Sequence, residues 1–267
     1  MSDPLAGRVA VVTGGSRGIG RGIALHLARA GTDCVITYRR NAEAARETVA
    51  ALEASGRRAM ALPLELAEPE RVGPAFDRIA AAFGRVDVLV ANAAAAAFRP
   101  VLEQKPHNVR RTFSITVDAF VAMAQAAVPL MAGRPGRIVL VSGIDSFQAM
   151  DGHSVLGAAK AAAEGLVRGL ALELGPRGVT VNAVTPGFIR TDSSTYYVTQ
   201  GLGLDYERAT ERLRAATPVR RHGTTEDVAE LVGYLVSDAA SFVTGQCIVI
   251  DGGLTITSPM TRMGEPS

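Results

Sequence analysis

A glycine-rich turn near the start of the chain holds the first residues that could do chemistry. The segment 13–20 reads Thr-Gly-Gly-Ser-Arg-Gly-Ile-Gly and lies between an apolar run and a stretch of helical period. Glycines here let the backbone turn tightly and approach a pyrophosphate, whose charge the following helix N-terminus stabilises. A structural turn could explain such a motif alone, but the strand-turn-helix context favours a dinucleotide site. The predicted contacts are Gly14, Ser16, Arg17, Gly18, Ile19 and Gly20.

Two arginines end the second apolar run, where an acid would indicate a different cofactor. An NAD site requires a carboxylate there for the ribose 2′-hydroxyl, whereas this chain reads Thr37-Tyr38-Arg39-Arg40. Arg17, Arg39 and Arg40 could instead bind a 2′-phosphate through charge-assisted hydrogen bonds. The alternative is that Arg39 and Arg40 are a solvated pair at a helix entry. We therefore predict NADP(H) rather than NAD.

The elements that must position these residues alternate along the chain. Short β-branched apolar runs predict strands, with longer stretches of helical period between them. This alternation is typical of an α/β protein with a parallel sheet covered on both faces, and no linker divides residues 1–267 into two domains. The expected strands are 8–13, 34–38, 58–64, 86–91, 137–141, 179–184 and 247–250. The expected helices are 19–30, 42–54, 69–83, 111–132, 153–174 and 225–237, several closed by glycines such as Gly84 and Gly175.

Composition argues against several other classes of protein. The net charge is +2 and tryptophan is absent, so the chain lacks the basic, aromatic surface expected for nucleic-acid binding. Cys34 and Cys247 stand in apolar runs without partners at motif spacing, which predicts inert core thiols and no metal site. We find neither a leader-like N-terminus nor an uncharged 18-residue apolar stretch. We therefore expect a cytoplasmic protein with no membrane partner.

From Val9 to Gly253 the chain resembles the short-chain dehydrogenase/reductase family. The matching pieces are the 13–20 turn, Asn92-Ala93-Ala94, Lys160, Asn182, Pro186-Gly187 with Ile189 and Thr191, and Asp251-Gly252-Gly253. The resemblance implies a single-domain Rossmann fold with a doubly wound parallel seven-stranded sheet, assembled as a homotetramer or homodimer. It also implies cofactor contacts from Glu65 and Leu66 to adenine, from Asn92, Ala93, Ala94 and Lys160 to ribose, and from Pro186, Gly187, Ile189 and Thr191 to the carboxamide.

The chain departs from the family at three of its four catalytic positions. The resemblance implies a set of Asn, Ser, Tyr and Lys, and the corresponding residues here are Thr116, Gly143, Leu156 and Lys160. In the family's mechanism the tyrosine hydroxyl passes a proton to the carbonyl oxygen while hydride arrives at carbon. Leucine cannot do this, so ordinary alcohol–ketone chemistry is in doubt.

The chain is most similar to the enoyl-thioester (enoyl-acyl-carrier-protein) reductase branch, whose tyrosine stands seven residues before the lysine. That position is His153, and on a helix His153, Leu156 and Lys160 share one face. A helix N-terminus and a nearby lysine favour neutral imidazole, which could hydrogen-bond an enolate oxygen. The alternatives are that His153 only enters a helix after the turn formers Asp151 and Gly152, and that Lys160 is a solvated charge.

A polar segment at about 190–218 is expected to form a substrate lid. It contains Tyr196, Tyr197 and Tyr206, three of only five tyrosines. Tyr196 or Tyr197 could supply the missing hydroxyl or could simply cover the pocket mouth. The apolar residues expected to line a substrate channel, or to pack in the core, are Phe98, Phe147 and Met150.

Three functions fit these features. The first is an NADP(H)-dependent reductase of a conjugated C=C or carbonyl group, with His153 and Lys160 as the catalytic residues. Its substrate would be an apolar acyl or polyketide-like small molecule, which could be a thioester and could be bound to a carrier protein. The second is a non-redox cyclase, dehydratase or isomerase, and the third a catalytically silent cofactor-binding subunit. We favour the first, because hydride transfer requires only a bound nicotinamide and a receptive carbon, and His153, a lid tyrosine or water can supply the proton.

Overall fold

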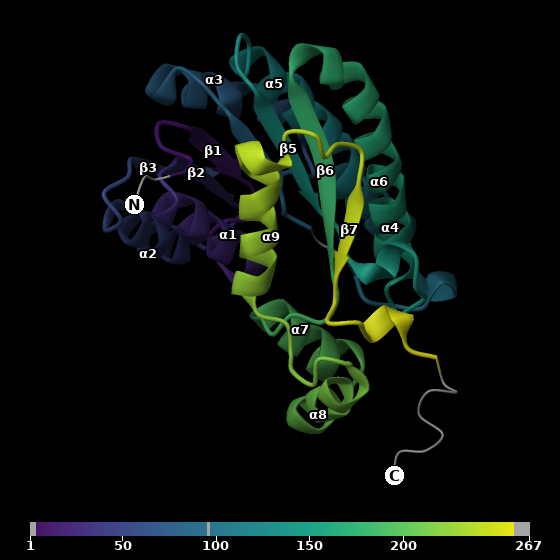
Figure 1. Ribbon diagram of the computed structural model, residues 1–267. Coiled ribbons are helices and arrows are strands. Elements are labelled where there is room, and N and C mark those ends of the chain that lie inside the picture. Colours follow the sequence, from purple (N-terminus) through teal and green to yellow (C-terminus); the bar gives the residue numbers. More distant parts are fainter. Residues whose placement is uncertain (1–3, 95–96, 259–267) are drawn as a thin grey trace.

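The computed structural model describes residues 4–94 and 97–258, so residues 1–3, 95–96 and 259–267 of the expected domain lie outside the description. The described residues form one seven-stranded parallel sheet in the order β3-β2-β1-β4-β5-β6-β7 (Figure 1). The strands are β1 (Val9–Val12), β2 (Asp33–Tyr38), β3 (Ala59–Pro63), β4 (Val88–Ala91), β5 (Gly136–Val141), β6 (Val179–Pro186) and β7 (Cys247–Ile250). The predicted doubly wound fold is confirmed.

Helices cover both faces of this sheet (Figure 1). One face packs against α1 (Gly18–Arg29), α2 (Ala42–Glu53) and α9 (Thr225–Val236), and the other against α3 (Val72–Phe83), α5 (Ala119–Leu130) and α6 (Ser154–Leu174). Strands β1, β4, β5 and β6 are buried along their whole length. Their sequences therefore read as continuous apolar runs without alternation.

The predicted helix 111–132 is divided into three pieces. It consists of α4 (Pro106–Phe113), a π-helical turn η3 (Ser114–Asp118) and α5. Pro106–Leu130 is long and apolar enough to span a membrane, but this is weak evidence because core helices meet the same criterion. α5 contributes Phe120, Met123 and Ala127 to the core, as expected for such a helix.

The predicted glycine cap at Gly175 is confirmed as the C-cap of α6, but it lacks the left-handed backbone of the usual glycine cap. Gly175 has a right-handed backbone (φ −52°), and the chain continues through the short turn η5 (Gly175–Arg177) to Gly178, whose φ is +73°. Gly84 also caps its helix, α3, but with φ +70°. The remaining short turns are η1 (Pro69–Arg71), η2 (Val101–Glu103), η4 (Ile144–Ser146), η7 (Asp238–Ala240) and η8 (Leu254–Ile256).

The segment expected to form a lid is largely helical. It contains α7 (Asp192–Tyr196), a π-helical turn η6 (Tyr197–Gly201) and α8 (Tyr206–Ala216), and these lie beyond the carboxyl ends of the strands, in green in Figure 1. Thr191 and Ser194 form a capping box at α7, and Asp205 accepts a hydrogen bond from the Arg208 N–H at α8. These caps are the sequence signals that would have revealed both helices.

One threonine joins the two loops at the point where the strand order reverses. Thr13, after β1, is fully buried, and its Oγ1 accepts hydrogen bonds from the backbone N–H groups of Asn92 (3.0 Å) and Ala93 (3.1 Å) after β4. The Asn92 side chain donates back to the Thr13 carbonyl oxygen at 2.9 Å. This reversal point is where ligands bind in sheets of this kind, so Thr13 shapes the floor of the expected site.

Replacing Thr13 by valine should destabilise the protein, because the part-buried N–H groups of Asn92 and Ala93 lose their acceptor. The expected loss is about 1–3 kcal/mol in the free energy of unfolding, measured by urea denaturation. Thr13→Ser keeps the hydroxyl and serves as the matched control, with a smaller expected loss. Equal losses in the two variants would show that the methyl group, and not the hydrogen bonds, matters at this position.

Candidate functional site

The glycine turn after β1 brings the backbone close to the loop after β4. Gly14 and Gly18 have left-handed backbones, with φ values of +64° and +54°. A Cβ on Gly20 would lie 2.5 Å from Asn92 Nδ2, and one on Gly14 would lie 3.2 Å from Ala93. The N-terminus of α1 follows with no acidic residue in its first turn. This arrangement fits a phosphate-binding turn.

The predicted cationic residues lie beside this turn. The N–H of Gly15 donates to the Thr37 carbonyl oxygen at 3.1 Å, which holds the turn against the end of β2. Arg17, Arg39 and Arg40 are all exposed there and able to reach a ligand. Ser16 and Ile19, the other predicted contacts with side chains in this turn, are half-buried.

Glu65 and Leu66, expected near adenine, follow β3 at the same edge. The Leu66 side chain is buried in the core, whereas Glu65 forms an ion pair with Arg111 at 3.1 Å. Burial alone would raise the pKa of Glu65, but hydrogen bonds from the Ala67 N–H and Arg111, with the charges of Arg111 and Arg39, hold it below its ordinary value.

The predicted carboxamide contacts follow β6. Pro186 ends that strand, and a Cβ on Gly187 would lie 2.6 Å from the Asp251 Cβ. Ile189 is buried. A Cβ built on Gly18 would lie 3.7 Å from Cγ2 of Thr191. The loops after β1 and β6 therefore meet. Ala94, in the loop after β4, is exposed at the same edge.

One carboxylate connects the two predicted catalytic residues. Asp145, in η4 after β5, accepts a hydrogen bond at Oδ1 from Lys160 Nζ, and its Oδ2 lies 3.0 Å from His153 Nδ1. The Lys160 bond is also 3.0 Å long. The side chain of Asp145 is 4% exposed, that of His153 13% and that of Lys160 14%. Our sequence reasoning missed Asp145, although an acid just past a strand at the carboxyl edge is a usable signal.

The Asp145 carboxyl group is ionised at neutral pH. Burial alone would raise its pKa, but the hydrogen bond from His153 and the charge and hydrogen bond of Lys160 leave that pKa below its ordinary value. An ionised carboxylate can only accept hydrogen bonds, so Nδ1 of His153 carries the proton. In the neutral ring, Nε2 then has a lone pair and no proton, so it can only accept a hydrogen bond. This corrects our expectation that neutral His153 hydrogen-bonds an enolate oxygen, since only the protonated ring offers an Nε2–H.

Aromatic rings enclose the other nitrogen of His153. Phe98 stacks on the imidazole with ring centroids 4.7 Å apart, and Tyr197 of the lid packs edge-on at 4.3 Å. Nε2 is buried and has no hydrogen-bond partner among the described residues. Leaving such an atom unpaired costs about 1–3 kcal/mol, so it is a natural contact for a ligand once a ring moves aside.

Of the two neighbouring lid tyrosines, Tyr197 packs against His153 with its hydroxyl already engaged, and Tyr196 is largely exposed. The Tyr197 hydroxyl donates to the Asp151 carbonyl oxygen at 3.0 Å. Burial, followed by the charges of Asp151 and Asp145, raises the pKa of Tyr197 above its ordinary value. Tyr196 is 60% exposed. The geometry therefore favours the covering role over the donor role.

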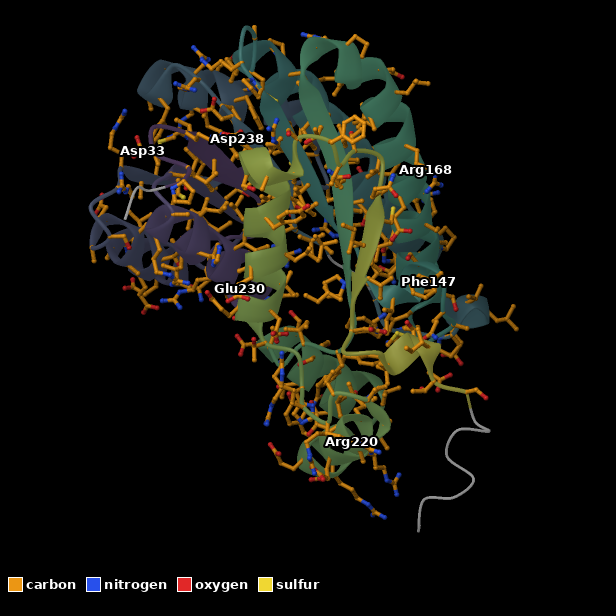
Figure 2. All side chains as sticks on the ribbon, in the orientation of Figure 1. Asp33, Phe147, Arg168, Arg220, Glu230 and Asp238 are labelled. Atoms are coloured by element: carbon orange, nitrogen blue, oxygen red, sulfur yellow. The ribbon has the colours of Figure 1, made fainter. Side chains whose placement is uncertain are left out.

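The other expected channel and catalytic positions differ in exposure. Phe147 is 55% exposed and lies near one end of α6 in Figure 2, while Met150 is half-buried. Leu156 is buried within α6. Thr116 is buried in η3, and its Oγ1 lacks a hydrogen-bond partner within the described part of the chain.

The two cysteines are thiols whose ionisation is disfavoured by burial. Burial is the main cause that raises the pKa of Cys34 to about 12, and it also raises the pKa of Cys247. Both are free thiols. In residues 4–94 and 97–258 we find no group of three or more acidic, histidine or cysteine side chains that could hold a metal ion.

Fold and site together define a class of protein. A parallel sheet of this strand order, with a glycine turn at the reversal point and arginines after the second strand, is a Rossmann-type dinucleotide-binding domain. The family model described as enoyl-(acyl carrier protein) reductase matches residues 14–255. The chain belongs to the short-chain dehydrogenase/reductase family, near the enoyl reductase branch.

Named relatives are similar over nearly the whole chain. The 1-cyclohexenylcarbonyl-CoA reductase of Streptomyces collinus is 40% identical, over 94% of this chain and 88% of its own. The tetrahydroxynaphthalene reductase of Pestalotiopsis fici is 34% identical, over 94% and 92%. A short-chain dehydrogenase from Burkholderia cenocepacia in complex with NADP is 38% identical, with a TM-score of 0.86 over 94% of this chain and 99% of its own.

Proposed function

We propose that the protein is an NADP(H)-dependent reductase that saturates a conjugated C=C bond in a small apolar acyl thioester. The observation that carries this proposal is the linkage of His153 and Lys160 through Asp145, with leucine at the position of the usual tyrosine. Reduction of an enoyl group delivers hydride to the β-carbon and leaves an enolate to be protonated. It therefore demands less of an acid than carbonyl reduction does.

NADP(H) fits the residues at the sheet edge. The solved relative from Burkholderia cenocepacia holds NADP, which supports the predicted preference over NAD. The glycine turn would hold the pyrophosphate, and Arg17, Arg39 and Arg40 the 2′-phosphate. When bound, the reduced nicotinamide supplies the hydride. Lys160 has three N–H donors and uses one on Asp145, which leaves two for the ribose.

His153 is the proposed proton donor. Its protonated ring would give the Nε2 proton to the substrate enolate and keep the Nδ1–H bond to Asp145. The Asp145 carboxylate faces Nδ1 at 3.0 Å, so a positive charge on the ring would lie beside a negative one. Phe98 and Tyr197 keep water from Nε2 when the lid is closed.

The relatives suggest the size and polarity of the substrate. The name of the Streptomyces collinus enzyme points to a cyclic enoyl-CoA. The substrate of this protein would be a similar enoyl thioester, attached either to CoA or to a carrier protein. A polyketide-like carbonyl is the second candidate, because the Pestalotiopsis fici relative is a tetrahydroxynaphthalene reductase. The missing tyrosine favours the enoyl substrate of the two.

We also propose that the chain forms a homotetramer or homodimer through α5 and α6. These helices border a shallow groove lined mainly by apolar side chains, including Val121, Leu166 and Leu170. Gly165 and Gly169 are exposed on α6, and a Cβ on either would meet nothing within 4 Å. Small residues of this kind allow a second subunit to pack closely.

Removal of the two arginines after β2 should weaken NADPH binding specifically. We expect Arg39→Ala/Arg40→Ala to raise the Kd for NADPH by about 10-fold or more, because charge-assisted hydrogen bonds to the 2′-phosphate are lost. The Kd for NADH should change little. Calorimetry measures both, and Arg46→Ala, an exposed arginine paired with Glu43, is the control. An equal loss for both cofactors would contradict the assignment.

Replacement of His153 should slow reduction without abolishing cofactor binding. With 1-cyclohexenylcarbonyl-CoA as the probe, we expect His153→Gln to lower kcat about 100-fold, as for loss of a general acid. Loss of NADPH absorbance gives the rate, and mass spectrometry identifies a product with two added hydrogens. The exposed His107→Gln is the matched control.

Two outcomes would contradict the proposal. Unchanged turnover in His153→Gln would remove His153 as the donor. If NADPH binds but no enoyl or ketone acceptor causes its oxidation, the reductase assignment fails. Conversion of a substrate without cofactor oxidation would then favour the non-redox enzyme, and no conversion the silent binding subunit.

A bulky charge at Gly169 should disrupt assembly without unfolding the chain. We expect Gly169→Arg to lower the molecular mass measured by light scattering, because the side chain would project into the groove between subunits. Gly73→Arg, at another open and exposed helical position that does not line this groove, is the control. An unchanged oligomer in Gly169→Arg would exclude this face as the interface.

A further inference from the structure

We infer that Asp145 is a positioning residue that fixes the tautomer of His153, so that Nε2 is the atom that exchanges a proton with the substrate. The part of this inference that concerns proton transfer rests on the proposed function. The part that concerns the tautomer rests on the protein alone. The geometry of four residues supports it: Gly143, Asp145, Gly157 and His153.

Two glycines create the space that Asp145 occupies. A Cβ on Gly157 would lie 2.1 Å from the Asp145 carbonyl oxygen, so only glycine allows the η4 turn to lie this close to α6. A Cβ on Gly143 would lie 2.6 Å from Asp145 Oδ1 and 2.5 Å from Lys160 Nζ. Gly143 stands where the family has serine. Its lack of a side chain is what lets the carboxylate reach Lys160.

The two carboxylate oxygens have separate partners. Oδ1 accepts from Lys160 Nζ, and Oδ2 accepts from His153 Nδ1. Because both contacts require an acceptor, both oxygens are needed. An asparagine has one acceptor oxygen and one amide group that only donates. Facing the lysine ammonium, the oxygen is the favoured atom, which leaves the amide group toward His153.

Asp145→Asn is therefore expected to invert the tautomer of His153. With an amide N–H donating to Nδ1, the single proton of the neutral ring moves to Nε2. The ring could then hydrogen-bond an enolate but would no longer be stabilised as a proton donor. A similar carboxylate-to-amide change at a catalytic histidine leaves the geometry intact and still suppresses catalysis through the wrong tautomer.

Other charges near His153 cannot replace this carboxylate. Lys160 from the same helix is cationic, and Tyr197 from the lid donates its hydroxyl proton to a backbone carbonyl. Asp151 lies in the turn before α6, where its side chain is exposed to solvent and its carbonyl oxygen is the one that Tyr197 contacts. Asp151→Asn is thus the matched control, since it removes a nearby charge without removing a hydrogen bond to His153.

The first arm of the test reads the tautomer directly. The chain has four histidines, so long-range proton–nitrogen NMR on protein labelled with ¹⁵N-histidine gives a short list of rings, and His153→Gln assigns the one of interest. At neutral pH we expect the Nδ1–H form in the unaltered protein and in Asp151→Asn, and the Nε2–H form in Asp145→Asn. An Nδ1–H ring in Asp145→Asn would overturn the inference.

The second arm reads the consequence for turnover. With NADPH and 1-cyclohexenylcarbonyl-CoA, Asp145→Asn should lower kcat by about 100-fold and flatten its pH profile, because a neutral amide replaces the carboxylate that faces Nδ1 of His153. An inverted tautomer with unchanged kcat and pH profile would overturn the catalytic part. If the unaltered protein does not oxidise NADPH at all, the proposed function fails while the first arm still decides the tautomer.

Gly157→Ala tests the position of Asp145 without changing its chemistry. The added methyl group must push the η4 turn away from α6, so we expect a mixture of His153 tautomers and a smaller loss of kcat than in Asp145→Asn. Circular dichroism and NADPH binding show whether each variant is folded. A Gly157→Ala protein that is folded and keeps both the Nδ1–H ring and full kcat would contradict the requirement for this slot.

Discussion

Parallel pairing throughout the sheet determines where every functional residue lies. All strands run in one direction, so each must return through a covering element, and the loops after the strands meet at one edge. Gly14, Asn92, Asp145 and Gly187 follow four different strands and still gather there. The reversal of strand order between β1 and β4 separates the covering helices at this edge. The hydrogen bonds of Thr13 then hold the two adjacent loops together.

Much of this framework could be predicted from the sequence, because burial on both faces leaves an unmistakable pattern. The strand at Cys247–Ile250 begins and ends where expected, and α9 was expected over nearly the same residues. The lid helices were not expected. They depend on caps at Thr191 and Asp205 and have little buried surface, so they lack the apolar stripe on which helix prediction relies. The π-helical turn at Thr116 leaves no pattern in the sequence at all.

The candidate site likewise has parts that the sequence predicts and parts that it does not. The position of the glycine turn was predictable, because tight turns and helix starts leave characteristic glycines in the sequence. The state of His153 was not, because it depends on a contact eight residues away in sequence, through a turn whose path only the folded chain defines. Helix dipole and Lys160 alone suggest a neutral donor. A buried carboxylate beside Nδ1 holds the proton there, so the neutral ring has no N–H at Nε2 to donate. Comparison with the family's usual residues shows which side chains are missing but does not reveal this contact.

The glycines at 143 and 157 also limit how this site can change over time. A serine regained at 143 would meet the ion pair of Asp145 and Lys160 before a tyrosine at 156 could use it. A tyrosine gained first would enter a buried position of α6 beside a lysine that is already bound to Asp145. Each single step toward the family's usual arrangement therefore disturbs the present one without completing the other. The present arrangement and one with serine at 143 and tyrosine at 156 are thus separated by more than one substitution.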